Sequence, residues 1–291
     1  MPKTADCTNT TLVRADACVG APSSLSTFCH AASAAPPLTL PMNASIVLSL
    51  VFFADQVRDR YRRVPRDAYT REFRRIRNLL TSMRYVGTTL PVTVLVGGNR
   101  SLEHERELVY AHPHVRLHPV TPFPTPSWAS KWHRHSFQKL SAMGLTRYER
   151  VLVLDNDCQL RANIDALPSS VRAPAAVWIP ASGKKHGAPM FNSGVMVLQP
   201  SASALSTLAS RALLPAPTSH VLSRERDGSD QQLLMSMDWN WTQLPLKYNA
   251  NRALCMADAD WRDVQVLHLI SGFEYSRRSP AWVKGTTFWK R

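Results

Sequence analysis

Short apolar runs alternate with longer amphipathic segments along this chain, and the short runs predict strands. Nearly uninterrupted runs of valine, leucine and isoleucine are typical of strands that are covered on both faces. The ordered chain is expected to begin at Ala44, just before the first run. The predicted strands are Ile46–Phe53, Pro91–Gly98, the mixed segment Val115–Val120, and Val151–Leu154.

The segments between these strands have helical periodicity. The clearest helix begins near Tyr69, after a capping aspartate, Asp67. Its apolar positions recur every three to four residues, at Phe73, Ile76, Leu80 and Met83. Further helices are predicted over Leu102–Tyr110 and Ser136–Leu145. Because strands and helices alternate, we predict an α/β fold with a mostly parallel central sheet and helices on both faces.

Composition divides the chain into two parts. Residues 1–43 are rich in alanine, serine, threonine and proline and lack periodicity, so we predict a disordered N-terminal tail. Lys3 and Arg14 are its only basic side chains before His30, which argues against an organelle transit peptide. Residues 44–291 are expected to form one domain. The longest nearly apolar run, Ala44–Ala54, is too short to cross a bilayer, so no transmembrane segment is expected.

The formal net charge of +14 indicates an anionic partner, such as a phosphorylated substrate, a membrane surface or nucleic acid. Much of this charge lies between Arg58 and Arg77. There we favour a solvated helical face over a dedicated binding patch, and we do not expect nucleic acid to be the partner.

The cysteines form neither a metal-binding pattern nor a disulfide framework. They are Cys7, Cys18, Cys29, Cys158 and Cys255. Their odd number slightly favours a reducing compartment such as the cytoplasm over an organelle or the Golgi lumen. Glycosylation triplets at Asn9, Asn43 and Asn240 oppose this only weakly, because such triplets arise often by chance.

Two aspartates, Asp155 and Asp157, directly follow the predicted strand Val151–Leu154. In open α/β sheets, ligands bind beyond the carboxyl ends of strands, and side chains two apart in extended chain point the same way. Two close carboxylates repel each other unless a cation lies between them, and hard divalent cations prefer oxygen ligands. The pattern leaves two interpretations open, a metal site and an Asp-Asn-Asp turn that merely closes the strand.

Three further segments carry polar residues with both a structural and a functional interpretation. Asn192–Gly194 would suit a turn before a strand, and Ser229 or Asp230 would suit a helix cap. His268 lies in an apolar segment, where a lone histidine is more often a hydrogen-bonded core residue than a ligand. The chain has no GxGxxG or GxxxxGKS/T motif, which argues against dinucleotide and P-loop sites.

Taken together and in this order, the segments resemble glycogenin and its relatives, the family 8 retaining glycosyltransferases. The resemblance covers about Ile46–Trp282. It is strongest over Gln138–Leu167, which contains a lysine, a Leu-Thr-x-Tyr turn, the Asp-x-Asp pair and an Asn-Ile-Asp-x-Leu tail. The later motifs that follow the family's order are Phe191–Val197, Asp230-Gln231, Leu244–Asn249 and His268.

That resemblance implies a GT-A fold, which is a single Rossmann-like domain, together with a nucleotide-sugar donor such as a UDP-hexose and a manganese ion. Asp155, Asp157 and His268 would be the metal ligands, and such a mixed oxygen and nitrogen set suits Mn²⁺. The metal would bridge the diphosphate of the donor and stabilise the charge on the leaving nucleotide.

The resemblance also implies roles for residues around the metal. Lys139, Asn156 and Gly272 would contact the donor, and the Tyr69 ring would stack on its base. The residues expected near the sugar and the reacting centre are Asn192, Ser193, Asp227, Asp230 and Gln231.

The chain departs from the family pattern in two places around the donor. An arginine-rich insertion separates Phe53 from the Asp67–Tyr69 turn, so the base pocket differs from the family's. Where the family has Lys-Pro-Trp, this chain has Pro280-Ala-Trp282, so we expect Arg277 or Arg278 to supply the phosphate contact.

We therefore predict a metal-dependent retaining hexosyltransferase whose acceptor, a glycan, protein or small molecule, the sequence leaves open, as it does the oligomeric state, a homodimer included. No tyrosine lies between Asn249 and His268, which argues against a self-priming glycogenin. Two rivals stay open. A sugar nucleotidyltransferase would need a glycine-rich loop, and residues 46–70 contain no glycine. The other is a non-catalytic basic binding protein on a degenerate scaffold.

Overall fold

The computed structural model of the chain describes residues 43–52, 68–98, 101–131, 133–179, 190–217, 228–251 and 258–269. The predicted tail up to residue 42 lies outside the described residues, as do the predicted cap Asp67 and the predicted site residues Asp227, Gly272, Arg277 and Arg278. Among the described helices, none combines the length and the apolar character needed to cross a membrane.

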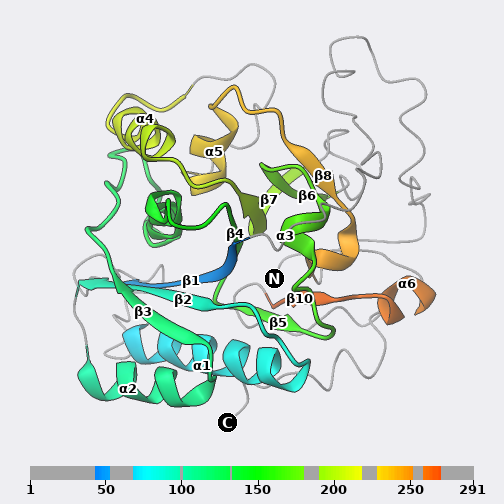
Figure 1. Ribbon diagram of the computed structural model, residues 1–291. Coiled ribbons are helices and arrows are strands. Elements are labelled where there is room, and N and C mark those ends of the chain that lie inside the picture. Colours follow the sequence, from blue (N-terminus) through cyan, green and yellow to red (C-terminus); the bar gives the residue numbers. More distant parts are fainter. Residues whose placement is uncertain are drawn as a thin grey trace, which may run out of the picture.

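A seven-stranded sheet forms the centre of the described structure (Figure 1). In spatial order its strands are β3 (Val115–Pro119), β2 (Val92–Gly98), β1 (Ala44–Phe52), β4 (Arg150–Leu154), β7 (Met190–Leu198), β6 (Ala175–Ile179) and β8 (Thr242–Leu244). Strands β3, β2, β1 and β4 are parallel, β7 runs antiparallel between β4 and β6, and β8 is parallel to β6. The predicted mostly parallel sheet is confirmed.

Helices cover both faces of this sheet because its central strands are apolar on both sides. In β1, Ile46 and Leu48 pack into one layer, while Val47 and Val51 pack into the other. The first layer contains α1 (Ala68–Tyr85) and α2 (Leu102–Ala111), and the second contains η3 (Ser136–Gly144), α4 (Ala202–Ala212) and α5 (Asp230–Met235) (Figure 1). Three shorter helices are α3 (Leu167–Ser170), η4 (Leu246–Tyr248) and α6 (Asp258–Arg262).

The third predicted helix differs in kind from the expectation. Over Ser136–Gly144 the chain forms a 3₁₀ helix, whose side chains from Phe137 to Met143 are all buried. Within it, the side-chain amide of Gln138 pairs with the backbone of Phe123, accepting from its N–H and donating to its carbonyl, both at 2.9 Å. These two hydrogen bonds anchor η3 at the residue that directly precedes Lys139.

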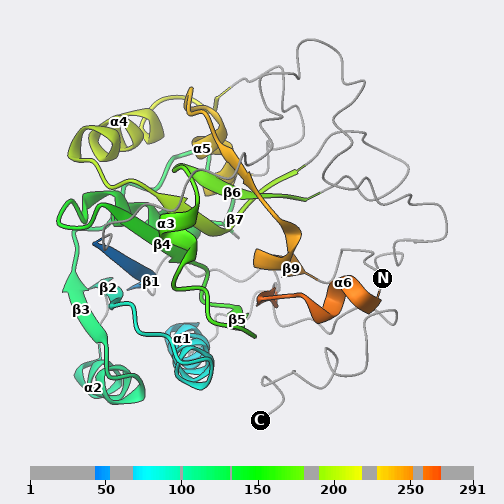
Figure 2. The same ribbon diagram turned by 45° about the vertical axis from the view of Figure 1, so that its right-hand side comes forward.

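A second, three-stranded sheet lies at the edge of the domain (Figure 2). Its strands are β5 (Cys158–Leu160), β10 (Val266–His268) and β9 (Ala250–Asn251). Strand β10 lies between the others, with His268 opposite Cys158 on β5 and Asn251 on β9. Because β5 follows β4 after a short turn, this pairing brings the end of β10 to the carboxyl end of β4.

The packing of α1 on the sheet supports a stability prediction. Ile76 is fully buried between α1 and the sheet, so Ile76→Ala should lower the free energy of unfolding by about 2–5 kcal/mol. Thr81→Ala, on the exposed face of the same helix, should change it by less than about 0.5 kcal/mol. Urea unfolding measures both, and equal losses for the two variants would contradict this packing.

Candidate functional site

Asp155 and Asp157 lie in a turn that joins β4 to β5. The N–H of Asp155 donates to the carbonyl of Gly194 on β7 (2.9 Å), and the N–H of Cys158 donates to the carbonyl of Asp155 (3.0 Å). Of the two interpretations, the turn is confirmed, and it does not exclude the predicted metal site. The residues do form a turn, and this turn, rather than an extended segment, brings the two carboxylates to one place.

His268 brings a third potential ligand to this turn. One carboxylate oxygen from each aspartate and one ring nitrogen of His268 all lie within 4.8 Å of one another. The Nε2 atom is 3.2 Å from Oδ1 of Asp157 and 3.7 Å from Oδ2 of Asp155. The residue is 5% exposed, so it is as buried as a core histidine, yet its ring faces two carboxylates. Ligands on one ion with bonds of about 2.1 Å lie about 3 Å apart, which fits this spacing.

The local charges favour a cation among these three side chains. Burial raises the pKa of Asp155, and the negative charges of Asp157 and Asp230 raise it further, against the opposing effect of Lys139 and His268. Burial by itself lowers the pKa of His268, but the carboxylates of Asp157 and Asp155 outweigh it and raise that pKa. For Asp155, the raised pKa means that the nearby positive charges compensate its negative charge only in part. For His268, the raised pKa means that the two carboxylates stabilise a positive charge on the ring.

The donor set is oxygen and nitrogen without sulfur. Cys158 follows the turn directly, but burial raises the pKa of its thiol well above the usual range. Its Sγ donates to the carbonyl of Gly194 at 3.5 Å instead. Two carboxylates and an imidazole, with a neutral thiol turned aside, fit a hard divalent ion such as Mn²⁺.

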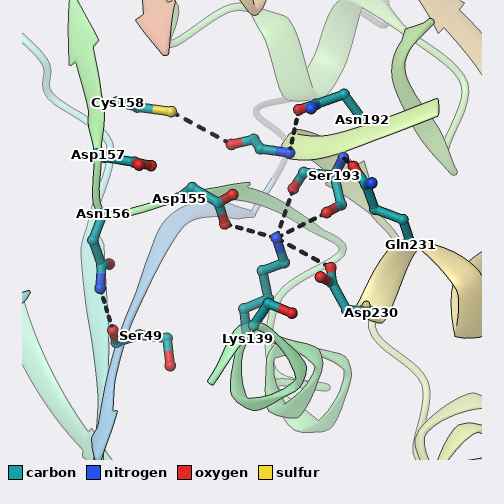
Figure 3. A network of polar contacts seen from close by, with 12 residues as sticks. Ser49, Lys139, Asp155, Asn156, Asp157, Cys158, Asn192, Ser193, Asp230 and Gln231 are labelled. Carbon is teal, nitrogen blue, oxygen red and sulfur yellow. Dashed lines mark hydrogen bonds and ion pairs between the residues drawn. The ribbon is translucent and has the colours of Figure 1, made fainter. Parts of the chain in front are cut away.

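Lys139 is the buried cation at the centre of the neighbouring polar network (Figure 3). It is 4% exposed, and its Nζ lies 2.6 Å from Oδ1 of Asp155 and 3.1 Å from Oδ2 of Asp230. The same ammonium donates to the hydroxyl (2.9 Å) and the carbonyl (3.1 Å) of Ser193. Burial lowers the pKa of Lys139, but the two carboxylates more than reverse this, so the ammonium keeps its charge. Lys139, which was predicted to contact the nucleotide-sugar donor, thus links the aspartate turn to Ser193 on β7 and Asp230 on α5.

Most residues predicted to lie near the sugar gather around this lysine. Asn192 and Ser193 lie within β7, not in a turn before it, and Asp230 and Gln231 begin α5. The N–H of Ser193 donates to Oε1 of Gln231 (3.0 Å), which joins the two elements (Figure 3). The predicted helix-cap position is occupied by Ser229. The structure therefore brings together four of the residues that the sequence placed near the sugar.

Asn156 contacts α1, and Tyr69 lies in the first turn of the same helix. The Asn156 side-chain amide donates to the carbonyl of Ser49 on β1 (2.8 Å) and to the carboxylate of Glu72 on α1 (3.3 Å), and it points away from the two aspartates (Figure 3). One helical turn before Glu72, the Tyr69 ring stacks on His104 of α2, with centroids 5.5 Å apart. Asn156 therefore anchors the turn, and α2 supports the Tyr69 ring from one side.

Asn249 and Gly194 belong to this cluster, although the sequence did not predict them as site residues. Asn249 is completely buried, and its side-chain oxygen lies 2.8 Å from Nδ1 of His268. Gly194 leaves the space that the His268 ring occupies, because a Cβ at this position would lie 2.5 Å from Nδ1. A glycine inside a strand pattern often marks a bulge or a close approach, which is the signal that could have identified it.

Comparison with protein-family models and with curated proteins finds no match. Among solved structures, the chain is similar to the galactosyltransferase LgtC in complex with donor and acceptor sugar analogs, with a TM-score of 0.52 and 16% identity, covering 84% of this chain and 93% of that one. It is also similar to the glycosyltransferase GlyE of Streptococcus pneumoniae TIGR4, with a TM-score of 0.51 and 16% identity over 82% of this chain and 58% of that one.

A further similarity, to the bifunctional glycosyltransferase WbbM, has a TM-score of 0.49 and 16% identity, and covers 86% of this chain but 48% of that one. At these identities the likeness concerns the fold. The described structure has the GT-A fold of glycosyltransferases, with the aspartate turn beyond the carboxyl end of β4.

The space at Gly194 generates a prediction for metal binding. Gly194→Ala should displace the His268 ring and weaken Mn²⁺ binding by more than about tenfold, because a misplaced ligand cannot complete the set. Gly144→Ala is the matched control, since its added methyl meets only the flexible end of Leu205 at 3.2 Å. Calorimetric titration with Mn²⁺ compares them, and wild-type affinity in Gly194→Ala would refute the assignment.

Proposed function

We propose that this protein is a metal-dependent retaining glycosyltransferase of the glycogenin-like family 8, which transfers a hexose from a UDP-sugar to a glycan, protein or small-molecule acceptor. The observation that carries the proposal is the convergence of Asp155, Asp157 and His268 on a GT-A fold. They meet beyond the carboxyl end of β4, where open α/β sheets bind ligands. Both the position of these three residues and their oxygen and nitrogen ligand atoms support a metal-dependent transferase site.

The main chemical demand of such a transfer is to neutralise the charge that develops on the leaving diphosphate. A divalent ion, Mn²⁺ in this proposal, supplies Lewis-acid stabilisation of that charge when bound. Asp155, Asp157 and His268 would hold the ion. Lys139 adds a permanent positive charge beside them, since its ammonium stays protonated between Asp155 and Asp230.

The sugar is proposed to lie by the polar groups around Lys139. Asn192, Ser193, Asp230 and Gln231, together with Asp227, would contact its hydroxyl groups. Their support is the network itself, because the hydrogen bond from Ser193 to Gln231 and the ion pair of Asp230 hold these groups in fixed positions. Fixed oxygens suit a reacting carbon that becomes oxocarbenium-like, since they need no rearrangement as positive charge develops.

The nucleotide is proposed to lie toward α1. Its base would stack on the Tyr69 ring, which His104 supports from one side, and Asn156 would hold the adjoining turn in place. Gly272 and Arg278 are proposed to contact the diphosphate, since a guanidinium suits phosphate well. The net charge of +14 would also favour an anionic donor.

The two rival functions are not favoured. The similar solved structures named above, LgtC and GlyE, are glycosyltransferases. A non-catalytic binding protein would have no need for two carboxylates and an imidazole directed at one point within 4.8 Å.

The direct test is to incubate the purified chain with Mn²⁺ and a panel of UDP-sugars and to measure UDP release. We expect slow hydrolysis of one donor, which Mn²⁺ supports and a chelator abolishes, because the leaving diphosphate needs a counter-charge. Addition of candidate acceptors should accelerate it. A chain that releases UDP from no donor and shows no metal-dependent binding of UDP would refute the proposal.

The metal site generates a second prediction. Asp157→Ala removes one ligand and should weaken Mn²⁺-dependent UDP binding by more than about a hundredfold, while far-UV circular dichroism stays unchanged. Glu107→Ala, which removes an exposed carboxylate on α2, is the control and should bind UDP normally. Calorimetric titration with UDP, with and without Mn²⁺, gives the answer. Unchanged metal-dependent binding by Asp157→Ala would show that the ion is held elsewhere.

A further inference from the structure

We propose that Asn249 is a positioning residue that sets the imidazole tautomer of His268 and so directs an unprotonated Nε2 at Asp155 and Asp157. The proposal rests on the proposed function in one respect, because it takes these three side chains to be metal ligands. It is carried by a continuous chain of hydrogen bonds that starts from a backbone N–H.

The first link lies in a bulge of β7. The register between β6 and β7 shifts between the pairs Ala176–Met196 and Val177–Asn192, so β7 carries extra residues at this point. Within the bulge, the N–H of Gly194 donates to the side chain of Asn192 at 2.9 Å. A backbone N–H can only donate, so the Asn192 atom that faces it must be the carbonyl oxygen, Oδ1.

The second link fixes the orientation of Asn249. The same Oδ1 of Asn192 lies 2.7 Å from the Asn249 amide. Because this oxygen only accepts, the Asn249 atom facing it must be the NH₂ group. The carbonyl oxygen of Asn249 is then turned to His268, where it lies 2.8 Å from Nδ1. Asn249 is completely buried, so a flip that exchanged these atoms would leave buried polar groups mismatched.

The third link sets the ring. An amide oxygen only accepts, so Nδ1 of His268 must carry the proton, and in the neutral ring Nε2 carries the lone pair. Nε2 lies 3.2 Å from Asp157 and 3.7 Å from Asp155. Without a metal ion a second proton on the ring can bridge Nε2 and Asp157, and a bound cation would take the place of that proton. In the opposite tautomer, an Nε2–H would donate to these carboxylates and occupy the place of the ion. A partner on the far ring nitrogen is the usual way in which proteins orient a metal-bound histidine.

The backbone holds Asn249 in register for this task. It ends η4, where its N–H donates to the carbonyl of Leu246 at 3.0 Å, and it directly precedes β9. Strand β9 pairs in parallel with β10, with Asn251 opposite His268. The hydrogen-bond chain therefore links the central sheet, which carries Asn192, to the small sheet, which carries His268. It thereby aligns His268 on the small sheet with the carboxylates of Asp155 and Asp157, which follow β4 of the central sheet.

Two substitutions separate positioning from simple packing. Asn249→Leu removes the oxygen that faces Nδ1, so Mn²⁺ affinity should fall by about 10- to 100-fold. Asn249→Asp keeps an oxygen toward Nδ1 but sets a second oxygen against Oδ1 of Asn192, so its melting temperature should fall while Mn²⁺ affinity stays within about threefold of wild type. Asn163→Leu, which removes an exposed asparagine that donates to Gly87, is the control and should bind Mn²⁺ normally.

The tautomer itself can be observed without metal. In ¹⁵N spectra of histidine-labelled protein at a pH where the His268 ring is neutral, wild type should show a protonated Nδ1, and Asn249→Leu should show a mixture or the opposite tautomer. The signal is assigned by its absence in His268→Gln. These readouts use Mn²⁺ alone and no sugar, so a chain that transfers no sugar can still pass them. A neutral wild-type ring protonated on Nε2, or unchanged Mn²⁺ affinity in Asn249→Leu, would overturn the inference.

Discussion

The partly buried negative charge of Asp155 is the constraint on which the rest of the site depends. Its Oδ1 lies 2.6 Å from the Lys139 ammonium, and its Oδ2 lies 3.7 Å from Nε2 of His268. A carboxylate that is even partly removed from water is destabilised unless positive charge compensates it. Lys139 compensates one side of this group, and the second carboxylate, Asp157, adds negative charge on the other. The fold therefore leaves a local excess of negative charge that a divalent ion would balance.

The architecture delivers these groups from separate parts of the chain. The parallel sheet ends β4 at the aspartate turn, and the 3₁₀ helix η3 places Lys139 on one side of it. The small sheet brings His268 to the other side, where the bulge in β7 leaves room for the ring at Gly194. These elements pack against one another in the two core layers, which holds the side chains close together before any ligand arrives. Such preorganisation is what stabilisation of a developing charge requires.

The local parts of this picture could be predicted from the sequence. Continuous apolar runs identified the parallel strands because both faces of the sheet are covered, and the carboxylates after β4 were visible in one short segment. The 3₁₀ character of η3 could not be predicted, since apolar spacings of three and four residues suit both kinds of helix. His268 was found only through a resemblance in motif order, because a lone histidine in an apolar segment carries no signal of its own.

The side-chain contacts within the site could not be predicted from the sequence. Lys139 was expected to contact a donor, and its ion pairs with Asp155 and Asp230 depend on elements far apart in the chain. The chain from Gly194 through Asn192 to Asn249 depends on a bulge and on the pairing of two sheets, neither of which leaves a periodic signal.

The most direct test of the central claim is anomalous diffraction at the manganese absorption edge from crystals grown with Mn²⁺ and UDP. The account predicts a single strong peak within bonding distance of Asp155, Asp157 and Nε2 of His268, with the UDP diphosphate beside it. The absence of a peak would contradict the account. So would a peak bound by other residues while Asp155, Asp157 and His268 contact only one another.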